Sequence, residues 1–281
     1  MVYHHKDSIR DVLEAYYKMN APIGLVPTMG ALHHGHLELI ARSQAENAIT
    51  IISIFVNPTQ FDNAGDLEKY PRTLEQDVAM IKELAGNFIV FNPSPEHLYE
   101  DDVRSQSYDF GGIEKEMEGA HRTGHFDGVG TVLSLFFKAL KPTNAYFGEK
   151  DFQQLQIVRK LVEIESLPVT IVGCPIVREE SGLAMSSRNK RLNETELEEA
   201  TLLHKTLLGA TERFESHTIE ELKKWAIHEF EKNPNIQLEY FEIAEADTLT
   251  SVSEKKKNTQ YRVFLAAFVG PVRLIDNMAL N

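Results

Sequence analysis

Short apolar segments alternate with longer amphipathic segments over the first two thirds of the chain, and this alternation restricts the fold most. The apolar runs are continuous, as in strands buried on both faces: Ile23–Val26, Ile49–Val56, Phe88–Phe91, Ala145–Phe147 and Val169–Val172. The segments between them have helical periodicity: His36–Asn47, Leu74–Leu84, Val129–Leu140 and Phe152–Glu165. The pattern predicts an α/β fold with a doubly wound, Rossmann-like parallel sheet.

The last third of the chain has a different order of predicted elements. Two capping-box patterns each predict the start of a helix, and two strand-like stretches follow them. These features are Asn193 with Glu196, Thr218 with Glu221, Ile236–Ala244 and Tyr261–Phe268. Helices followed by strands predict a small α+β domain. We therefore expect a larger domain over residues 1–175 and a smaller one over residues 176–281.

Charge and cysteine content exclude several classes of protein. The net charge is −13, and no long Lys/Arg cluster exists, which argues against nucleic-acid binding. Cys174 is the only cysteine, so no intrachain disulfide can form, and its apolar surroundings predict a buried structural thiol. Residues 1–6 lack the apolar core of a signal peptide, and no apolar run approaches the ~20 residues that span a bilayer. We expect a cytoplasmic protein without membrane association.

A loop rich in glycine and histidine follows the first predicted strand. It reads Pro27-Thr28-Met29-Gly30-Ala31-Leu32-His33-His34-Gly35-His36. Gly30 and Gly35 allow tight turns and close approach of a ligand, and the free N–H groups of a helix starting near Gly35 favour phosphate. His33 and His36 share one helical face and could stabilise charge on a polyphosphate. A surface pair of histidines at a helix end remains an alternative.

The H-x-G-H part of this loop resembles the signature of the nucleotidyltransferase superfamily. The longer string P-T-M-G-A-L-H-x-G-H resembles the form found in the pantothenate synthetase family. Three further stretches resemble that family in the expected order: Phe55–Phe61 with Asn57 and Gln60, Phe147–Gln154 with Lys150, Asp151 and Gln154, and Met185–Asn189 with Ser186, Ser187 and Arg188. Taken alone, each is open to a plainer reading as a turn, a helix cap or a loop.

The segment Glu118–Phe126 resembles the family less closely. Arg122 and His125 occupy key family positions, whereas Thr123 stands where the family usually has proline. Arg122 could contact phosphate or be structural, and His125 could equally be a hydrogen-bonded core residue.

The resemblance implies a reaction in two steps. ATP would adenylate pantoate with release of diphosphate, and β-alanine would then displace AMP. The implied catalytic residues are His33, His36, Lys150 and Arg188, with His36 as the proton donor. The implied nucleotide-binding residues are Met29, Gly30, His33, His36, Gly148, Glu149, Lys150, Asp151, Val177, Met185, Ser186, Ser187 and Arg188.

Gln60, Gln154, Asn57 and Arg122 would bind pantoate. Mg²⁺ would arrive with ATP, because no carboxylate cluster predicts a permanent metal site. The smaller domain would act as a lid, and the resemblance also implies a homodimer.

Three rival functions remain open at this point. A nucleotidyltransferase with another acid or alcohol acceptor would keep the same nucleotide motifs. A non-catalytic nucleotide sensor would not need His36, Lys150 and Arg188 together. A tRNA-binding protein is disfavoured by the charge of −13.

Overall fold

The structure is a computed structural model that describes residues 1–62, 64–100 and 102–281. The chain divides into two compact units. The first comprises Met1–Glu114, Glu118–Glu149 and Gln154–Pro175, and the second comprises Lys115–Met117, Lys150–Gln153 and Ile176–Asn281. Lys150–Gln153 therefore belongs to the second unit, although the chain on both sides of it belongs to the first.

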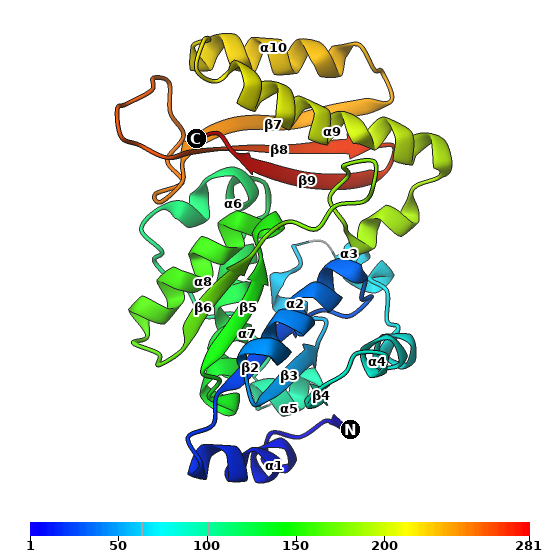
Figure 1. Ribbon diagram of the computed structural model, residues 1–281, viewed down its shortest axis with the longest axis vertical. Helices are drawn as coiled ribbons and strands as arrows, with labels where there is room; N and C mark the ends of the chain where they lie inside the picture. The colour runs from blue at the N-terminus through cyan, green and yellow to red at the C-terminus, as the bar shows by residue number, and fades with distance from the viewer. Residues whose placement is uncertain (63, 101) are drawn as a thin grey trace. The chain divides into compact units, whose positions relative to one another are not determined.

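A parallel sheet of six strands forms the centre of the first unit (Figure 1). The strand order is β1-β4-β3-β2-β5-β6. The strands are β1 (Val2–Tyr3), β2 (Ile23–Thr28), β3 (Ile49–Ile54), β4 (Phe88–Phe91), β5 (Asn144–Gly148) and β6 (Thr170–Cys174). This order and direction confirm the predicted doubly wound sheet.

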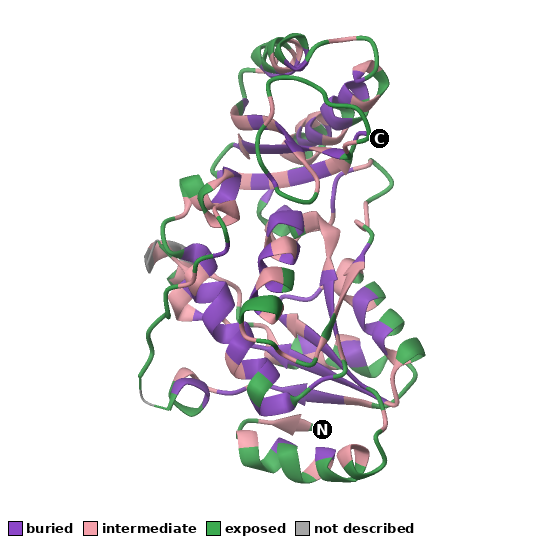
Figure 2. Cartoon of the chain, turned by 90° about the vertical axis from the view of Figure 1, so that its left-hand side faces the viewer, coloured by how far each residue is buried: buried purple, intermediate pink, exposed green. Residues whose placement is uncertain are grey.

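Helices and short 3₁₀ turns connect these strands. The helices are α1 (Lys6–Lys18), α2 (His34–Glu46), α3 (Ala64–Lys69), α4 (Leu74–Lys82), α5 (Pro95–Tyr99), α6 (Met117–His121), α7 (His125–Leu140) and α8 (Phe152–Ile164). The 3₁₀ turns are η1 (Pro58–Gln60), η2 (Ile113–Lys115) and η3 (Glu149–Asp151). Helix α7 is buried over most of its length (Figure 2), as its nearly continuous apolar sequence predicts.

The topology creates a switch point between β2 and β5. These two strands are neighbours, yet the chain leaves β2 toward β3 on one side and β5 toward β6 on the other. Ligands of such sheets bind beyond the carboxyl ends of the strands at this point. The His33–His36 loop follows β2, and Gly148 ends β5. The fold thus brings two of the predicted nucleotide-binding segments to the position where ligands of this sheet type bind.

The second unit has an antiparallel sheet of three strands and two long helices. The order is β7-β8-β9, with strands β7 (Ile236–Glu245), β8 (Tyr261–Val269) and β9 (Val272–Ala279). The helices are α9 (Glu194–Arg213) and α10 (Ile219–Glu231), and both predicted capping boxes are present at their N-termini. A separate apolar core with Leu203, Leu222 and Val263 joins helices and sheet. The predicted α+β class of this part is confirmed, with β9 as an additional strand.

Candidate active site

The loop after β2 has a locally unfavourable backbone conformation, and one buried carboxylate stabilises it through hydrogen bonds. Gly30 and Ala31 both have left-handed backbone angles, with φ of 81° and 51°. Asp77 of α4 accepts hydrogen bonds from the N–H groups of Ala31, at 3.1 Å, and Leu32, at 2.8 Å. Its side chain also accepts one from the Thr73 hydroxyl at 3.1 Å. Asp77 is 2% exposed, so these bonds form away from water. They fix the backbone conformation of the two residues that precede His33.

His33 and His36 lie together at the start of α2. Their ring centroids are 4.1 Å apart, and His33 is the residue that precedes the helix. The backbone N–H of His33 donates to Nδ1 of His36 at 3.3 Å. Since Nδ1 acts as an acceptor, a neutral His36 carries its proton on Nε2. His36 is thereby oriented as a hydrogen-bond donor through Nε2. His34, between them, is exposed and pairs with Glu38 at 3.2 Å.

Asn57 and Gln60 are connected to each other and to the glycine-histidine loop. The Asn57 amide donates to Gln60 Oε1 and to the Gly128 carbonyl, both at 3.1 Å. Its oxygen accepts from the Tyr99 hydroxyl at 2.5 Å. The Asn57 side chain is therefore occupied within the protein and orients Gln60. Gln60 Nε2 lies 3.1 Å from the sulfur of Met29, a weak acceptor, which leaves donor capacity for a ligand.

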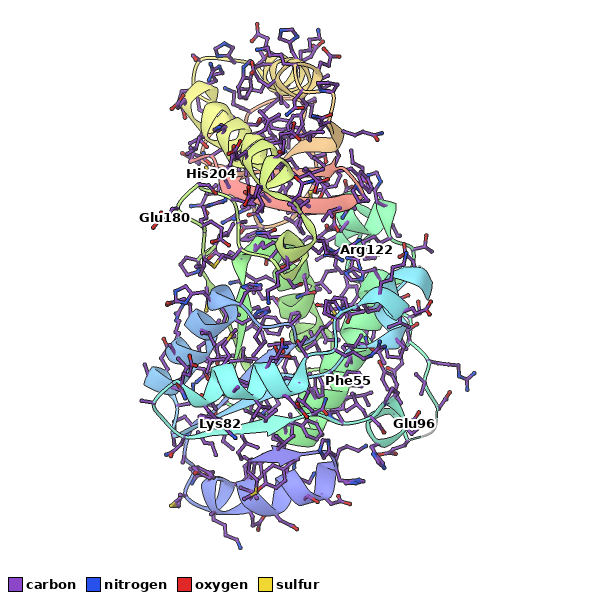
Figure 3. The ribbon with its side chains drawn as sticks, turned by 90° about the vertical axis from the view of Figure 1, so that its right-hand side faces the viewer. Phe55, Lys82, Glu96, Arg122, Glu180 and His204 are labelled. Carbon is purple, nitrogen blue, oxygen red and sulfur yellow. The ribbon has the colours of Figure 1, made fainter. Side chains whose placement is uncertain are left out.

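Helix α7 supports the same turn from the other side. The buried His125 ring is hydrogen bonded through Nδ1 to the Gln60 carbonyl at 2.9 Å, which confirms the reading of His125 as a bonded core residue. Gly128 is required there, because a Cβ at this position would lie 2.3 Å from the Thr59 carbonyl oxygen. Arg122 (labelled in Figure 3) forms an ion pair with Glu118 at 3.7 Å. The ion pair favours the structural alternative for Arg122.

The segment after β5 contains two adjacent glutamines with different surroundings. Gln153 is 4% exposed, and its amide donates to the Glu116 carbonyl at 2.7 Å. Gln154, the residue singled out from the sequence, is only partly buried. Gly148 has open space where a Cβ would lie, which leaves room beside the backbone at the end of β5. The structure thus assigns Gln153 to internal packing and leaves Gln154 accessible.

Lys150 and Asp151 belong to the second unit. The Lys150 ammonium is 3.7 Å from an Asp151 carboxylate oxygen. The Lys150 side chain is 18% exposed, whereas that of Asp151 is 49% exposed. The Lys150 carbonyl accepts a hydrogen bond from the Asn277 amide of β9 at 2.8 Å. The main chain of Lys150 is therefore fixed, while its charged end keeps access to solvent.

The predicted polyphosphate clamp follows a short hairpin in the second unit. Met185 N–H donates to the Val177 carbonyl at 3.0 Å, and Arg178 pairs with Ala184 in an antiparallel bridge. Ser186 then precedes η4 (Ser187–Arg191), with its hydroxyl accepting from the Arg188 N–H at 3.2 Å. The two serines and Arg188 are all partly exposed, and the loop geometry is preset by the chain itself.

The ion pair between Arg178 and Asp276 holds this hairpin, and Gly182 in its turn packs closely against His204. Arg178 forms two hydrogen bonds with Asp276 of β9, at 2.7 and 3.0 Å, and a third with the Gly182 carbonyl. Gly182 has φ of 88°, and a Cβ there would lie 2.1 Å from Nδ1 of His204. His204 belongs to α9 (Figure 3), and burial, aided by the charge of Arg178, lowers its pKa.

The structure also contains supporting residues that sequence reasoning missed. They are Asp77, Arg178, Asp276 and Asn277, whose partners lie up to 127 positions away in the chain. A signal existed for two of them, because Asp276 and Asn277 interrupt an otherwise apolar run, where a polar residue usually has a specific partner. Cys174 is buried, as predicted, and burial raises the pKa of its thiol.

Comparison with known proteins identifies the family. The family model described as pantoate-beta-alanine ligase matches residues 1–279. A pantothenate synthetase of Christiangramia forsetii is 49% identical over 280 residues, covering 100% of this chain and 99% of the relative. The pantothenate synthetase of Flavobacterium psychrophilum is 48% identical, with 100% of both chains covered.

Solved structures agree with the sequence comparison. Pantothenate synthetase from Thermus thermophilus superposes with a TM-score of 0.91 at 36% identity, covering 99% of each chain. Pantoate-beta-alanine ligase from Francisella tularensis, complexed with beta-gamma ATP and beta-alanine, has a TM-score of 0.82 at 35% identity. That match covers 100% of this chain and 97% of the other. The chain belongs to the pantoate-beta-alanine ligase family.

Proposed function

We propose that the chain condenses (R)-pantoate with β-alanine to give pantothenate, AMP and diphosphate, with pantoyl adenylate as the intermediate. As a member of its family, it is an ATP-dependent ligase that joins these two substrates. The two-step route and the residues assigned to it are our inference. The observation that carries it is the orientation of His36, whose Nδ1 accepts from the His33 N–H, so that the ring proton lies on Nε2.

In the first step, the pantoate carboxylate attacks the α-phosphorus of ATP, and diphosphate leaves. His36 donates a hydrogen bond through Nε2–H toward the departing phosphates, and His33 beside it adds a second polar group. Lys150 supplies a positive charge, and Arg188 supplies forked donors, aided by Ser186 and Ser187. The remaining proposed nucleotide contacts are made by Met29, Gly30, Gly148, Glu149, Asp151, Val177 and Met185.

Pantoate is held by neutral amides in this proposal. Gln60 keeps donor capacity beside its weak contact with the Met29 sulfur, and Gln154 is partly exposed one helical turn beyond Asp151. Asn57 contributes by orienting Gln60, and Arg122 by supporting the segment before α7. Amides suit a substrate with two hydroxyls and one carboxylate, because each can both donate and accept.

The second step requires that the adenylate survive until β-alanine attacks. The amine forms a bond to the acyl carbon, and AMP leaves with the bonding electrons. Because water would hydrolyse the adenylate, we propose that the C-terminal unit acts as a lid during turnover. Protection of residues 177–191 from hydrogen exchange on adding ATP is expected, and unchanged exchange there would contradict the lid.

Mg²⁺ is proposed to enter with ATP. No group of three or more metal-ligating side chains occurs in the described part of the chain. Mg²⁺ commonly binds through substrate phosphates and water with few protein ligands, and such binding fits this donor set. When bound, the ion would neutralise charge on the phosphate oxygens.

The remaining proposals concern the localisation, the oligomeric state and the partners of the protein. Among the described residues, no helix is long and apolar enough to cross a membrane. We propose a cytoplasmic homodimer whose partners are small molecules, without nucleic acid. Size measurement by light scattering would test the dimer.

The assay that tests the function is AMP release from ATP and Mg²⁺, with pantoate and β-alanine supplied together and each omitted in turn. Turnover that requires both substrates is the expected result. His36→Ala should reduce kcat by at least ~10²-fold. His34→Ala is the matched control, because His34 is exposed and contacts Glu38, and it should retain activity. AMP release with a different acid in place of pantoate would favour the rival acceptor.

A further inference from the structure

Two adjacent residues of β9, Asp276 and Asn277, have polar side chains buried within an apolar strand. Their exposed fractions are 3% and 2%. Consecutive residues of a strand direct their side chains to opposite faces, so the two can hold different partners. Burial of such groups is costly unless each is hydrogen bonded. Both residues have specific partners: Asn277 contacts Lys150, which is proposed to bind ATP, and Asp276 contacts Arg178 in the hairpin that precedes the Ser186–Arg188 loop.

Asn277 is tied to the segment that carries Lys150. Its amide nitrogen donates to the Lys150 carbonyl at 2.8 Å, and its amide oxygen accepts from the Arg262 guanidinium. The same guanidinium lies over the Phe152 ring, 3.9 Å from its centroid. Residues 150–152 are therefore attached to the sheet of the second unit by a hydrogen bond and by a stacked ring.

Asp276 is tied to the hairpin that precedes the clamp. It receives two hydrogen bonds from Arg178, whose guanidinium also donates to the Gly182 carbonyl at 3.0 Å. The hairpin ends at Met185, directly before Ser186 and Ser187. Two adjacent residues of β9 thus contact both the main chain of Lys150 and the hairpin that precedes Arg188.

We propose that Asp276 and Asn277 are positioning residues, which place the Lys150 main chain and the Ser186–Arg188 loop relative to one strand. The proposal rests on the nucleotide-binding roles proposed above for Lys150 and Arg188. A lysine side chain is flexible, so the position of its backbone decides how often the ammonium reaches the phosphates. Displacement of a catalytic group by about 1 Å can cost about 10²-fold in rate.

The substitution Asn277→Asp tests the contact to Lys150. Asp keeps the shape and the acceptor for Arg262, but it replaces the donor to the Lys150 carbonyl with a second acceptor. We expect kcat/KM for ATP to fall about 10- to 100-fold, with KM for β-alanine within about twofold of the unsubstituted enzyme. Asn193→Asp is the matched control, because it makes the same change of charge at an exposed helix cap where Asp serves equally well.

A second variant separates positioning from charge. Asn277→Ala also lacks the donor but adds no negative charge, so it should lose at least about fivefold in kcat/KM for ATP. A loss confined to Asn277→Asp would overturn the positioning role and indicate repulsion of ATP instead. Asn277→Ala also serves as the test if the aspartate variant does not fold.

A double-mutant cycle with Lys150→Ala decides whether Asn277 acts through Lys150. Single-turnover AMP formation, with enzyme in excess over ATP, keeps the slow variants measurable. If Asn277 acts through Lys150, Asn277→Asp should change the rate less than about twofold in the Lys150→Ala background. An equal loss in both backgrounds would show a general structural effect and overturn the proposal.

The cycle also separates this inference from the proposed function. Full activity of Lys150→Ala would refute the proposed role of Lys150 and this inference together. Loss of activity in Lys150→Ala, with full activity in both Asn277 variants, would refute only the positioning role.

Discussion

A buried aspartate holds a candidate site loop in each unit, but the partners of the two carboxylates differ. Asp77 of the first unit accepts hydrogen bonds from two backbone N–H groups and one hydroxyl, all of them neutral. Asp276 of the second unit faces the Arg178 guanidinium and receives two charged hydrogen bonds from it. The first loop is held by main-chain geometry, and the second by an ion pair between side chains. The difference predicts that the second loop is more sensitive to loss of charge.

The strongest test of this comparison is the pair Asp276→Asn and Asp77→Asn. Asp276→Asn leaves the largely buried Arg178 without a counterion and should lower the free energy of unfolding by about 3–5 kcal/mol. Asp77→Asn keeps one acceptor and places an N–H group against a donor, which should cost about 1–3 kcal/mol. Urea denaturation of both variants measures the difference. Equal losses would mean that the charge of Arg178 does not matter.

Substitution of Gly30 or Gly182, the glycines with left-handed angles in the two held loops, should have a smaller effect. Alanine at either position should cost about 1–2 kcal/mol for the backbone angle alone. Gly182→Ala should cost about 1 kcal/mol more than Gly30→Ala, because its Cβ would lie 2.1 Å from the His204 ring. At Gly30 the nearest atoms would be 3.0 and 3.1 Å away. His204→Ala in the Gly182→Ala background should recover the additional loss, and no recovery would exclude the ring as its cause.

The smallest expected effect is a pH dependence of stability that arises from His204, beside the second loop. Burial and the nearby Arg178 charge lower the pKa of His204, so its protonation is disfavoured in the folded state. The contribution of neutral His204 to the free energy of unfolding is therefore fully present above the ordinary histidine pKa of about 6.5. It is lost as the pH falls below that value. Unfolding midpoints at pH 7.5 and 5.5 should differ less in His204→Gln than in the unsubstituted chain. An identical shift in both would assign the pH dependence to other groups.

Local patterns in the sequence were sufficient for most of the fold. The strand from Phe88 to Phe91 was predicted with its observed bounds, and both capping boxes of the second unit are present. The helix predicted over Val129–Leu140 begins earlier, at His125, because Gly124 starts it with a left-handed angle rather than with a capping side chain. The strand predicted to reach Val56 ends at Ile54, where the chain turns toward η1.

Elements that depend on distant partners could not be predicted in this way. Helix α1 is a different case, because Ile9, Leu13 and Tyr16 recur at helical spacing, a local signal that the prediction did not use. The apolar sequence pattern of strand β9 is interrupted by Asp276 and Asn277, whose burial depends on Arg178 and Lys150. The site shows the same division. His33, His36, Gln60 and Lys150 come from motifs, whereas the residues that orient them are recognisable from three-dimensional contacts.

The assignment of Lys150–Gln153 to the C-terminal unit has a consequence for synthesis of the protein on the ribosome. Asn277 follows Lys150 by 127 positions in the chain. All strands of the parallel sheet are translated before the donor that holds the Lys150 carbonyl exists. A nascent chain can therefore complete the first sheet early, but the main chain of Lys150 acquires its final anchor after β9 has been made. Maturation of the enzyme should consequently lag behind folding of its larger unit.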